Sequence, residues 1–124
     1  GEYDRAIKYY AQTLDLYNNL NDKRGKALIY NNLSSVASDK NDYSGAIEYL
    51  FKAAEIFEES DNKLSLITVY SNIANLNHKL KKYDTALIYC EKSINTAKEI
   101  NDEKSVTGAY ATIGDVYFAI NDFD

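Results

Sequence analysis

The sequence predicts an all-α fold of six antiparallel helices, and two observations support this prediction. The first is a repetition with a period of 40 residues, seen most clearly at one aromatic position: Tyr3, Tyr43, Tyr83 and Phe123. The second is that apolar residues recur at helical spacing between short polar turns. The 124 residues include no proline and only five glycines, which argues against a β-sandwich with many turns.

Other positions repeat in the same register. An alanine follows the aromatic position by three residues, at Ala6, Ala46 and Ala86. A further tyrosine position holds Tyr30, Tyr70 and Tyr110. A single helix pair cannot bury its apolar face alone, so a repeat of this length indicates pairs that stack on one another. We expect the alanines to let the two helices of a pair approach closely.

The first three helices are expected over residues 3–20, 23–40 and 43–60, and each has an apolar face. In the first helix this face consists of Ala6, Tyr10, Leu14 and Tyr17. In the second, the spacing i, i+4, i+7 joins Ile29, Leu33 and Val36. The third has a wider face of Ala46, Ile47, Leu50, Ala53, Ala54 and Phe57.

The last three helices, expected over residues 63–80, 83–100 and 103–120, repeat this arrangement. The fourth helix has the apolar residues Val69, Ile73, Leu76 and Leu80. The fifth begins in the register of the third, with Tyr83, Ala86, Leu87 and Tyr89. The sixth presents Ala109, Ile113, Val116 and Ile120.

Pairs of asparagine and aspartate separate most of these segments: Asn21-Asp22, Asn41-Asp42, Asp61-Asn62, Asn101-Asp102 and Asn121-Asp122. Both residue types leave a helix easily and cap the next helix. The connections are therefore short, and neighbouring helices are expected to be antiparallel.

At these positions the chain resembles the tetratricopeptide repeat family in its longer form, with about 40 residues per repeat. The first-helix signature of that family is an aromatic, a large aliphatic, a small residue and a tyrosine, and the best copy here is Tyr110, Ile113, Gly114 and Tyr117. The proline that often closes the form with about 34 residues is missing, and Asn/Asp turns replace it. The resemblance implies a right-handed superhelical solenoid in which the first helix of each pair lines a concave groove.

Residues 1–124 form one predicted repeat array. It starts with the second helix of one pair and ends with the first helix of another pair. We therefore expect a fragment of a longer array. The first helix would leave Ala6, Tyr10, Leu14 and Tyr17 exposed, and the last would expose Tyr110, Ile113 and Val116. Because these surfaces are the two halves of one repeat interface, head-to-tail self-association is expected at high concentration.

No set of residues in the sequence indicates catalysis. The single histidine, His78, and the single cysteine, Cys90, are placed on different predicted helices, and no third group completes a catalytic set. Cys90 shares its repeat position with Tyr10 and Leu50, which indicates a small core residue, whereas His78 is expected at the surface or in the groove. No metal-ligand spacing or glycine-rich phosphate loop is present, so we expect no enzyme, metal or cofactor.

The candidate peptide-binding residues lie on the first helix of each predicted pair, over residues 23–40, 63–80 and 103–120. They are Asn31, Asn32, Ser35, Asp39, Ser71, Asn72, Asn75, Lys79, Thr112 and Asp115. The resemblance assigns Asn32 and Asn72 to the place where peptide-binding members carry an asparagine that bonds the peptide backbone; the alternative is that asparagine is simply common in this chain. The lysine-rich carboxylate clamp of chaperone-binding members is not matched, because Leu28, Thr68 and Gly108 stand where a lysine is expected.

The expected function is a protein–protein interaction scaffold that binds a peptide or helix in the groove. The alternative is a regulatory or sensor segment of a larger bacterial signalling or transcription-regulator protein.

The net charge of −5 argues against direct nucleic-acid binding, and no apolar run is long enough to cross a membrane. Segments 23–41 and 63–82, each the first helix of a predicted pair, have a net positive charge, whereas the second helices of the pairs all have a net negative charge. This distribution indicates either a basic inner layer or charges that are dispersed on solvated helix ends. We expect a cytoplasmic protein; the periplasm stays open, because periplasmic proteins can also lack disulfides.

Overall fold

A computed structural model describes residues 1–121, and six α-helices account for most of them. They are α1 (Glu2–Asn19), α2 (Lys23–Asp39), α3 (Tyr43–Glu59), α4 (Lys63–Lys79), α5 (Tyr83–Glu99) and α6 (Glu103–Asn121). Residues 1–121 contain no strand, so the prediction of an all-α fold with six helices is confirmed. Each helix boundary differs from the predicted one by one residue at most. Phe123, a member of the predicted repeat position, lies outside the described residues.

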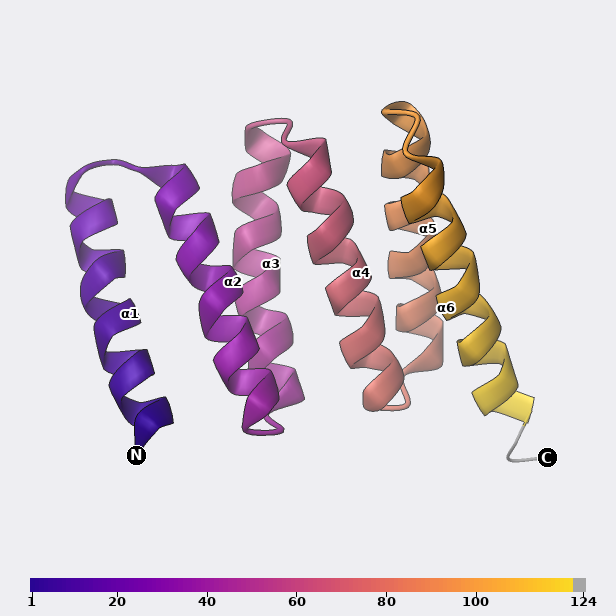
Figure 1. The fold of residues 1–124 in the computed structure, drawn as a ribbon, viewed down its shortest axis with the longest axis horizontal. Coiled ribbons are helices and arrows are strands. Elements are labelled where there is room, and N and C mark those ends of the chain that lie inside the picture. The colour runs from indigo at the N-terminus through magenta and orange to yellow at the C-terminus, as the bar shows by residue number, and fades with distance from the viewer. Residues whose placement is uncertain (122–124) are drawn as a thin grey trace. The chain divides into compact units, whose positions relative to one another are not determined.

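The helices belong to two compact units. The first unit, Gly1–Asp61, holds α1, α2 and α3, and α2 packs against both of its neighbours. The second, Asn62–Asp124, holds α4, α5 and α6; here α5 packs against both neighbours, and α4 also contacts α6. Successive helices within each unit run in opposite directions (Figure 1).

The turns use two residues with separate roles. The first residue adopts a positive φ, between 53° and 64°, at Asn21, Asn41, Asp61, Lys81 and Asn101. Asparagine and aspartate tolerate this left-handed conformation better than most other residues with a side chain. The second residue caps the next helix: the side chains of Asp22, Asp42, Asn62 and Asp102 accept a hydrogen bond from the backbone N–H three residues later, at 2.9 to 3.2 Å.

The turn before α5 departs from this pattern. Lys81 adopts a φ of 60° although it is neither asparagine nor aspartate. The N-terminal cap of α5 is Lys82, whose side chain makes no capping hydrogen bond. Lysine has no acceptor atom in its side chain, so the side chain of Lys82 accepts no hydrogen bond from the first backbone N–H groups of α5.

The core of the first unit forms where α2 meets α3. Leu33 of α2 and Leu50 of α3 are buried, and Ala46 is completely so. The hydroxyl of Ser34 donates a hydrogen bond of 2.9 Å to the backbone carbonyl of Ala46, so the two helices touch at side chains of one or two atoms. The expected close approach at this alanine is therefore present, and a larger side chain has no space there.

The second unit repeats this contact between α4 and α5 and continues it with α6. Ala74 and Ala86, at the positions of Ser34 and Ala46, are 1% and 0% exposed. Ile73 and Val116 are fully buried on α4 and α6. The expectation that Val116 is exposed on the last helix is therefore wrong, because its side chain packs inside the second unit. Both units therefore form a core from the residues that repeat in the sequence.

Helix α1 packs against α2. Its apolar residues Ala6, Tyr10, Leu14 and Tyr17, which were expected to be exposed, are half-buried. None of its residues is fully buried. Gly25 of α2 lies against the ring of Tyr17, since a Cβ atom added to Gly25 would come within 2.7 Å of two ring carbons. The glycine thus provides the space into which the tyrosine packs.

Candidate functional site

The first unit presents a polar stripe on α2. Asn32, Ser35 and Asp39 are exposed, and their spacing of three and four residues aligns them on one face of the helix. Leu33 and Ala37 are buried on the side that packs against the neighbouring helices. The hydroxyl of Ser35 donates to the carbonyl of Asn31 at 3.3 Å. The amide of Asn32 has no side-chain hydrogen bond among residues 1–121, so its donor and acceptor both face solvent.

The second unit presents the corresponding stripe on α4. Asn72, Asn75 and Lys79 are exposed at the repeat positions of Asn32, Ser35 and Asp39. Neither asparagine side chain has a hydrogen-bond partner within the described part of the chain. The face of Asn72 is set by Ile73 and Leu76, which are buried and fix the rotation of α4.

Helix α6 continues the polar stripe with fewer polar groups. Asp115 is exposed and Thr112 is half-buried. The hydroxyl of Thr112 donates to the carbonyl of Gly108 at 3.2 Å, one turn earlier in the same helix. Thr112 thus keeps an acceptor but has already used its proton within α6.

Asn31 and Ser71 occupy a different environment from the other predicted residues. Both are half-buried. The hydroxyl of Ser71 shares a hydrogen bond of 3.0 Å with that of Ser93 on α5, and Ser93 lies 3.4 Å from the carbonyl of Ile67. The Oδ1 atom of Asn31 is buried without a hydrogen-bond partner. Consecutive helical residues are about 100° apart, so these side chains turn away from the stripes of Asn32 and Asn72.

A hollow of about 240 Å³ lies between α4, α5 and α6, and we call it the Cys90 hollow. Its lining residues have small side chains: Ser71, Ala74, Cys90, Ser93, Ser105, Gly108, Ala109 and Thr112. It brings two predicted residues, Ser71 and Thr112, to one space. Cys90 is buried as expected, at 1% exposure, and burial raises the pKa of its thiol. The repeat position of Cys90 predicted a core residue but not the hollow beside it.

Several lysine side chains make ion pairs or aromatic contacts within their own helix pair. Lys23 at the start of α2 pairs with Glu59 at the end of α3 at 3.2 Å, and Lys63 pairs with Glu99 in the same way at 2.8 Å. The ammonium groups of Lys52 and Lys92 lie 5.5 to 5.9 Å from the tyrosine rings of their pairs. These contacts recur one period apart, so this part of the charge pattern belongs to the helix pairs themselves.

Among residues 1–121, the histidine and carboxylate side chains form no catalytic or metal-binding cluster. The imidazole of His78 is half-buried and lies against the ring of Tyr83, with centroids 5.9 Å apart. Within residues 1–121, no group of three histidine, cysteine or carboxylate residues is arranged to hold a metal ion. None of the described helices has the length and apolar character needed to span a membrane.

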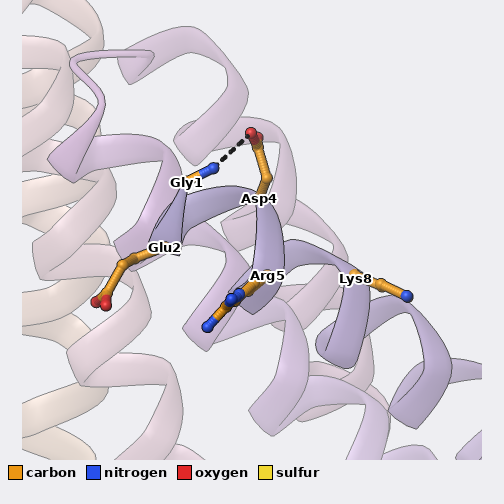
Figure 2. Close-up of a pocket in the computed structure, with 5 residues that line it drawn as sticks. All are labelled: Gly1, Glu2, Asp4, Arg5 and Lys8. Carbon is orange, nitrogen blue, oxygen red and sulfur yellow. Dashed lines mark hydrogen bonds and ion pairs between the residues drawn. The ribbon is translucent and has the colours of Figure 1, made fainter.

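A second, shallow hollow lies along the first two turns of α1 (Figure 2). Its five lining residues, Gly1, Glu2, Asp4, Arg5 and Lys8, are all exposed and come from one helix end. The terminal amino group contacts the Asp4 carboxylate at 3.4 Å. Charges of both signs point into solvent here, so no single ligand chemistry is favoured.

Comparison with known families gives two matches, both described as tetratricopeptide repeat. One family model matches residues 1–59 and another matches residues 66–105. The chain belongs to the tetratricopeptide repeat family. Members of this family are protein-interaction scaffolds, and the resemblance drawn from the tyrosine and alanine positions is confirmed.

Solved structures share the fold of this tetratricopeptide repeat chain. The crystal structure of BtubC (BKLC) from P. vanneervenii is 23% identical with a TM-score of 0.84, and the match covers 99% of this chain and 52% of that one. The crystal structure of the apo form of RapI is 21% identical with a TM-score of 0.77, covering 98% and 48%. The chain therefore spans about half the length of each of these proteins. No curated protein sequence matches it.

Proposed function

We propose that this tetratricopeptide repeat chain is a non-catalytic scaffold whose polar first-helix faces bind an extended peptide of a partner protein. The observation that carries the proposal is the pair Asn32 and Asn72, one period apart, each exposed and each without a side-chain partner among residues 1–121. A primary amide donates and accepts at once, which suits the alternating N–H and C=O groups of a peptide backbone. Each unit presents one such amide on a helix fixed by buried neighbours.

The neighbouring side chains support the same proposal. Ser35, Asp39, Asn75, Lys79 and Asp115 are exposed along the same faces, so they can contact side chains of a peptide. Asp39 and Lys79 occupy one repeat position with opposite charge. A peptide bound along α2 would therefore carry a basic group near Asp39.

The test begins with a random twelve-residue peptide library selected against the full chain. Isothermal titration then compares a selected peptide on wild type, Asn32→Ala, Asn72→Ala and the double variant. Each substitution leaves a peptide backbone group unpaired, which costs about 1–3 kcal/mol, or roughly 5- to 150-fold in affinity. The control is Asn95→Ala, which removes an exposed asparagine from α5 and should leave binding unchanged. Equal affinity of all variants would exclude the two asparagines from the binding surface.

The regulatory alternative uses the same surfaces and differs in the step after peptide binding. A sensor segment passes peptide binding on to an attached output domain, so the intact gene product would carry such a domain and its activity would respond to the selected peptide. A scaffold without an output domain would show binding alone.

We further propose that two copies associate head to tail through the exposed faces of α6 and α1. Tyr110 is 53% exposed and Tyr9 is 63% exposed. Their repeat equivalents pair within the chain, as Tyr30 with Tyr49 at 6.4 Å and Tyr70 with Tyr89 at 5.9 Å between ring centroids. A second copy would supply the missing ring in each case. Sedimentation should show concentration-dependent association that Tyr110→Asp abolishes, and a strict monomer at millimolar wild-type concentration would refute this contact.

A further inference from the structure

The Cys90 hollow is an unfilled space between the three helices of the second unit, and it opens to the surface beside the exposed Gly108. It measures about 240 Å³, and no lining side chain is longer than that of threonine. Protein interiors are close-packed, and a cavity of about 150 Å³ in another protein is large enough to take up benzene. The hollow is thus large enough for an aromatic ring and is left open by the residues that surround it.

The repeat pattern shows how the space arises. Four lining positions hold larger side chains one period earlier, where Asn31, Leu50, Thr68 and Val69 correspond to Ser71, Cys90, Gly108 and Ala109. Together these four exchanges remove more bulk than a phenyl ring. At the position of Cys90, the other copies hold Leu50 and Tyr10. The chain's own pattern therefore assigns a leucine-sized or tyrosine-sized group to this place.

The polar groups of the hollow favour an uncharged guest. The hydroxyls of Ser71 and Ser93 bond each other at 3.0 Å, and that of Ser105 donates to Asp102 at 2.6 Å. Only the Cys90 thiol, 1% exposed, lacks a hydrogen-bond partner among residues 1–121. No lining residue carries a charge at neutral pH, so a charged guest would lose its hydration without compensation. A sulfur atom beside an aromatic ring makes a favourable contact, which selects an aromatic guest over an aliphatic one.

We infer that the Cys90 hollow receives one uncharged aromatic side chain, phenylalanine or tyrosine, of the peptide that the chain binds. This inference rests on the proposed peptide binding. Ser71 of the hollow directly precedes Asn72, and Thr112 belongs to both the hollow and the polar face of α6. A peptide whose backbone bonds the Asn72 amide can thus place a neighbouring side chain in the hollow, with both contacts inside the second unit.

The experiment uses p-cresol, the tyrosine side chain without its backbone, and therefore needs no peptide. It is titrated into the full chain while backbone amide shifts are recorded by NMR. We expect saturable shifts at Gly108 and Ala109 with millimolar affinity, and no such shifts with benzoate, a charged ring of similar size. Alkylation of the Cys90 thiol by iodoacetamide should slow at least threefold in saturating p-cresol.

Filling the hollow should abolish these effects. Cys90→Leu restores the residue found one period earlier and should weaken p-cresol binding at least tenfold, and Ala109→Val provides a second filling variant if the first fails to fold. The control Glu91→Leu adds the same side chain at the adjacent exposed position and should bind like wild type. Absent shifts, or equal binding by wild type and both filling variants, would overturn the inference.

The outcomes separate this inference from the proposed function. A selected peptide that depends on Asn72 but binds Cys90→Leu as well as wild type would leave the peptide surface standing and refute the aromatic site. Saturable p-cresol binding that the filling variants abolish would support the aromatic site even if no selected peptide depended on Asn32 or Asn72.

Discussion

The turn before α5 offers a direct test of how the two-residue turns stabilise this fold. Four of the five turns end in aspartate or asparagine, whose side chain accepts a backbone N–H bond, whereas the fifth ends in Lys82, which makes none. Lys82→Asp would complete the pattern. In the other turns the bond comes from the third residue of the helix, so the new carboxylate is expected to accept from the N–H of Thr85.

Two effects add to the expected stabilisation. A capping side chain contributes about 1 kcal/mol, within a range of about 0.5–2 kcal/mol. Removing a positive charge from the positive end of the helix dipole and adding a negative one contributes a few tenths to about 1 kcal/mol more. The free energy of unfolding should therefore rise by about 1–2 kcal/mol. In urea, this corresponds to a midpoint higher by about 0.5–1 M for a slope near 2 kcal/mol/M.

The assay is urea unfolding followed by circular dichroism at pH 7, with two comparison variants. Lys82→Ala removes the charge but supplies no acceptor, so it separates the electrostatic part from the hydrogen bond. Asp42→Lys creates the reverse change at α3 and should lower stability by a similar amount. An unchanged midpoint for Lys82→Asp, together with a lower midpoint for Asp42→Lys, would show that the α5 terminus is satisfied in another way.

Further predictions concern single side chains. Gly25→Ala should destabilise the chain by about 1–2 kcal/mol, because the added Cβ would displace the Tyr17 ring. Gly114→Ala should stabilise the chain by up to about 1 kcal/mol through helix propensity, because a Cβ at this position meets nothing within 4 Å. Thermal unfolding of both variants checks the two predictions. Ala86→Leu should cost about 1–3 kcal/mol by overpacking a fully buried contact, and a wild-type melting temperature would contradict the helix pairing. The hydroxyl and backbone N–H of Ser105 lower the pKa of Asp102. The stability that this carboxylate adds is thus present above its unfolded pKa near 4 and is lost as pH falls through the lower folded value, which NMR titration of the carboxyl group should show.

The helices and turns could be predicted because each depends on residues close together in the sequence. In four of the five turns, two adjacent residues, each asparagine or aspartate, form the turn: the first adopts a positive φ and the second caps the next helix. Both roles depend on side-chain chemistry alone. The contact at Ala46 was predicted for a similar reason, since a repeated alanine on the apolar face indicates close approach. The hydrogen bond from Ser34 to its carbonyl was not, because it depends on the relative height of two helices.

The candidate surface was predictable only in part. Asn31 and Asn32 are identical neighbours, yet the Oδ1 atom of Asn31 is buried and the side chain of Asn32 is exposed. The difference arises from the rotation of α2, which is set by packing against α1 and α3 rather than by the asparagines. The Cys90 hollow was missed because its volume depends on side chains from three helices, and no single position reveals it.

Agreement and disagreement between repeats carry different information in this chain. The alanine contacts, the ion pairs Lys23–Glu59 and Lys63–Glu99, and the lysines above the tyrosine pairs recur one period apart. Each lies within one helix pair, so repeated residues rebuild the same contact and account for the fold. Three of the departures from the period, Cys90 for leucine, Gly108 for threonine and Ala109 for valine, fall around one hollow. Scattered exchanges would loosen the core in several places, whereas exchanges gathered at one space leave room for a guest while the pairs on either side stay packed. A search for function in a repeat protein of this kind should therefore begin where neighbouring copies differ.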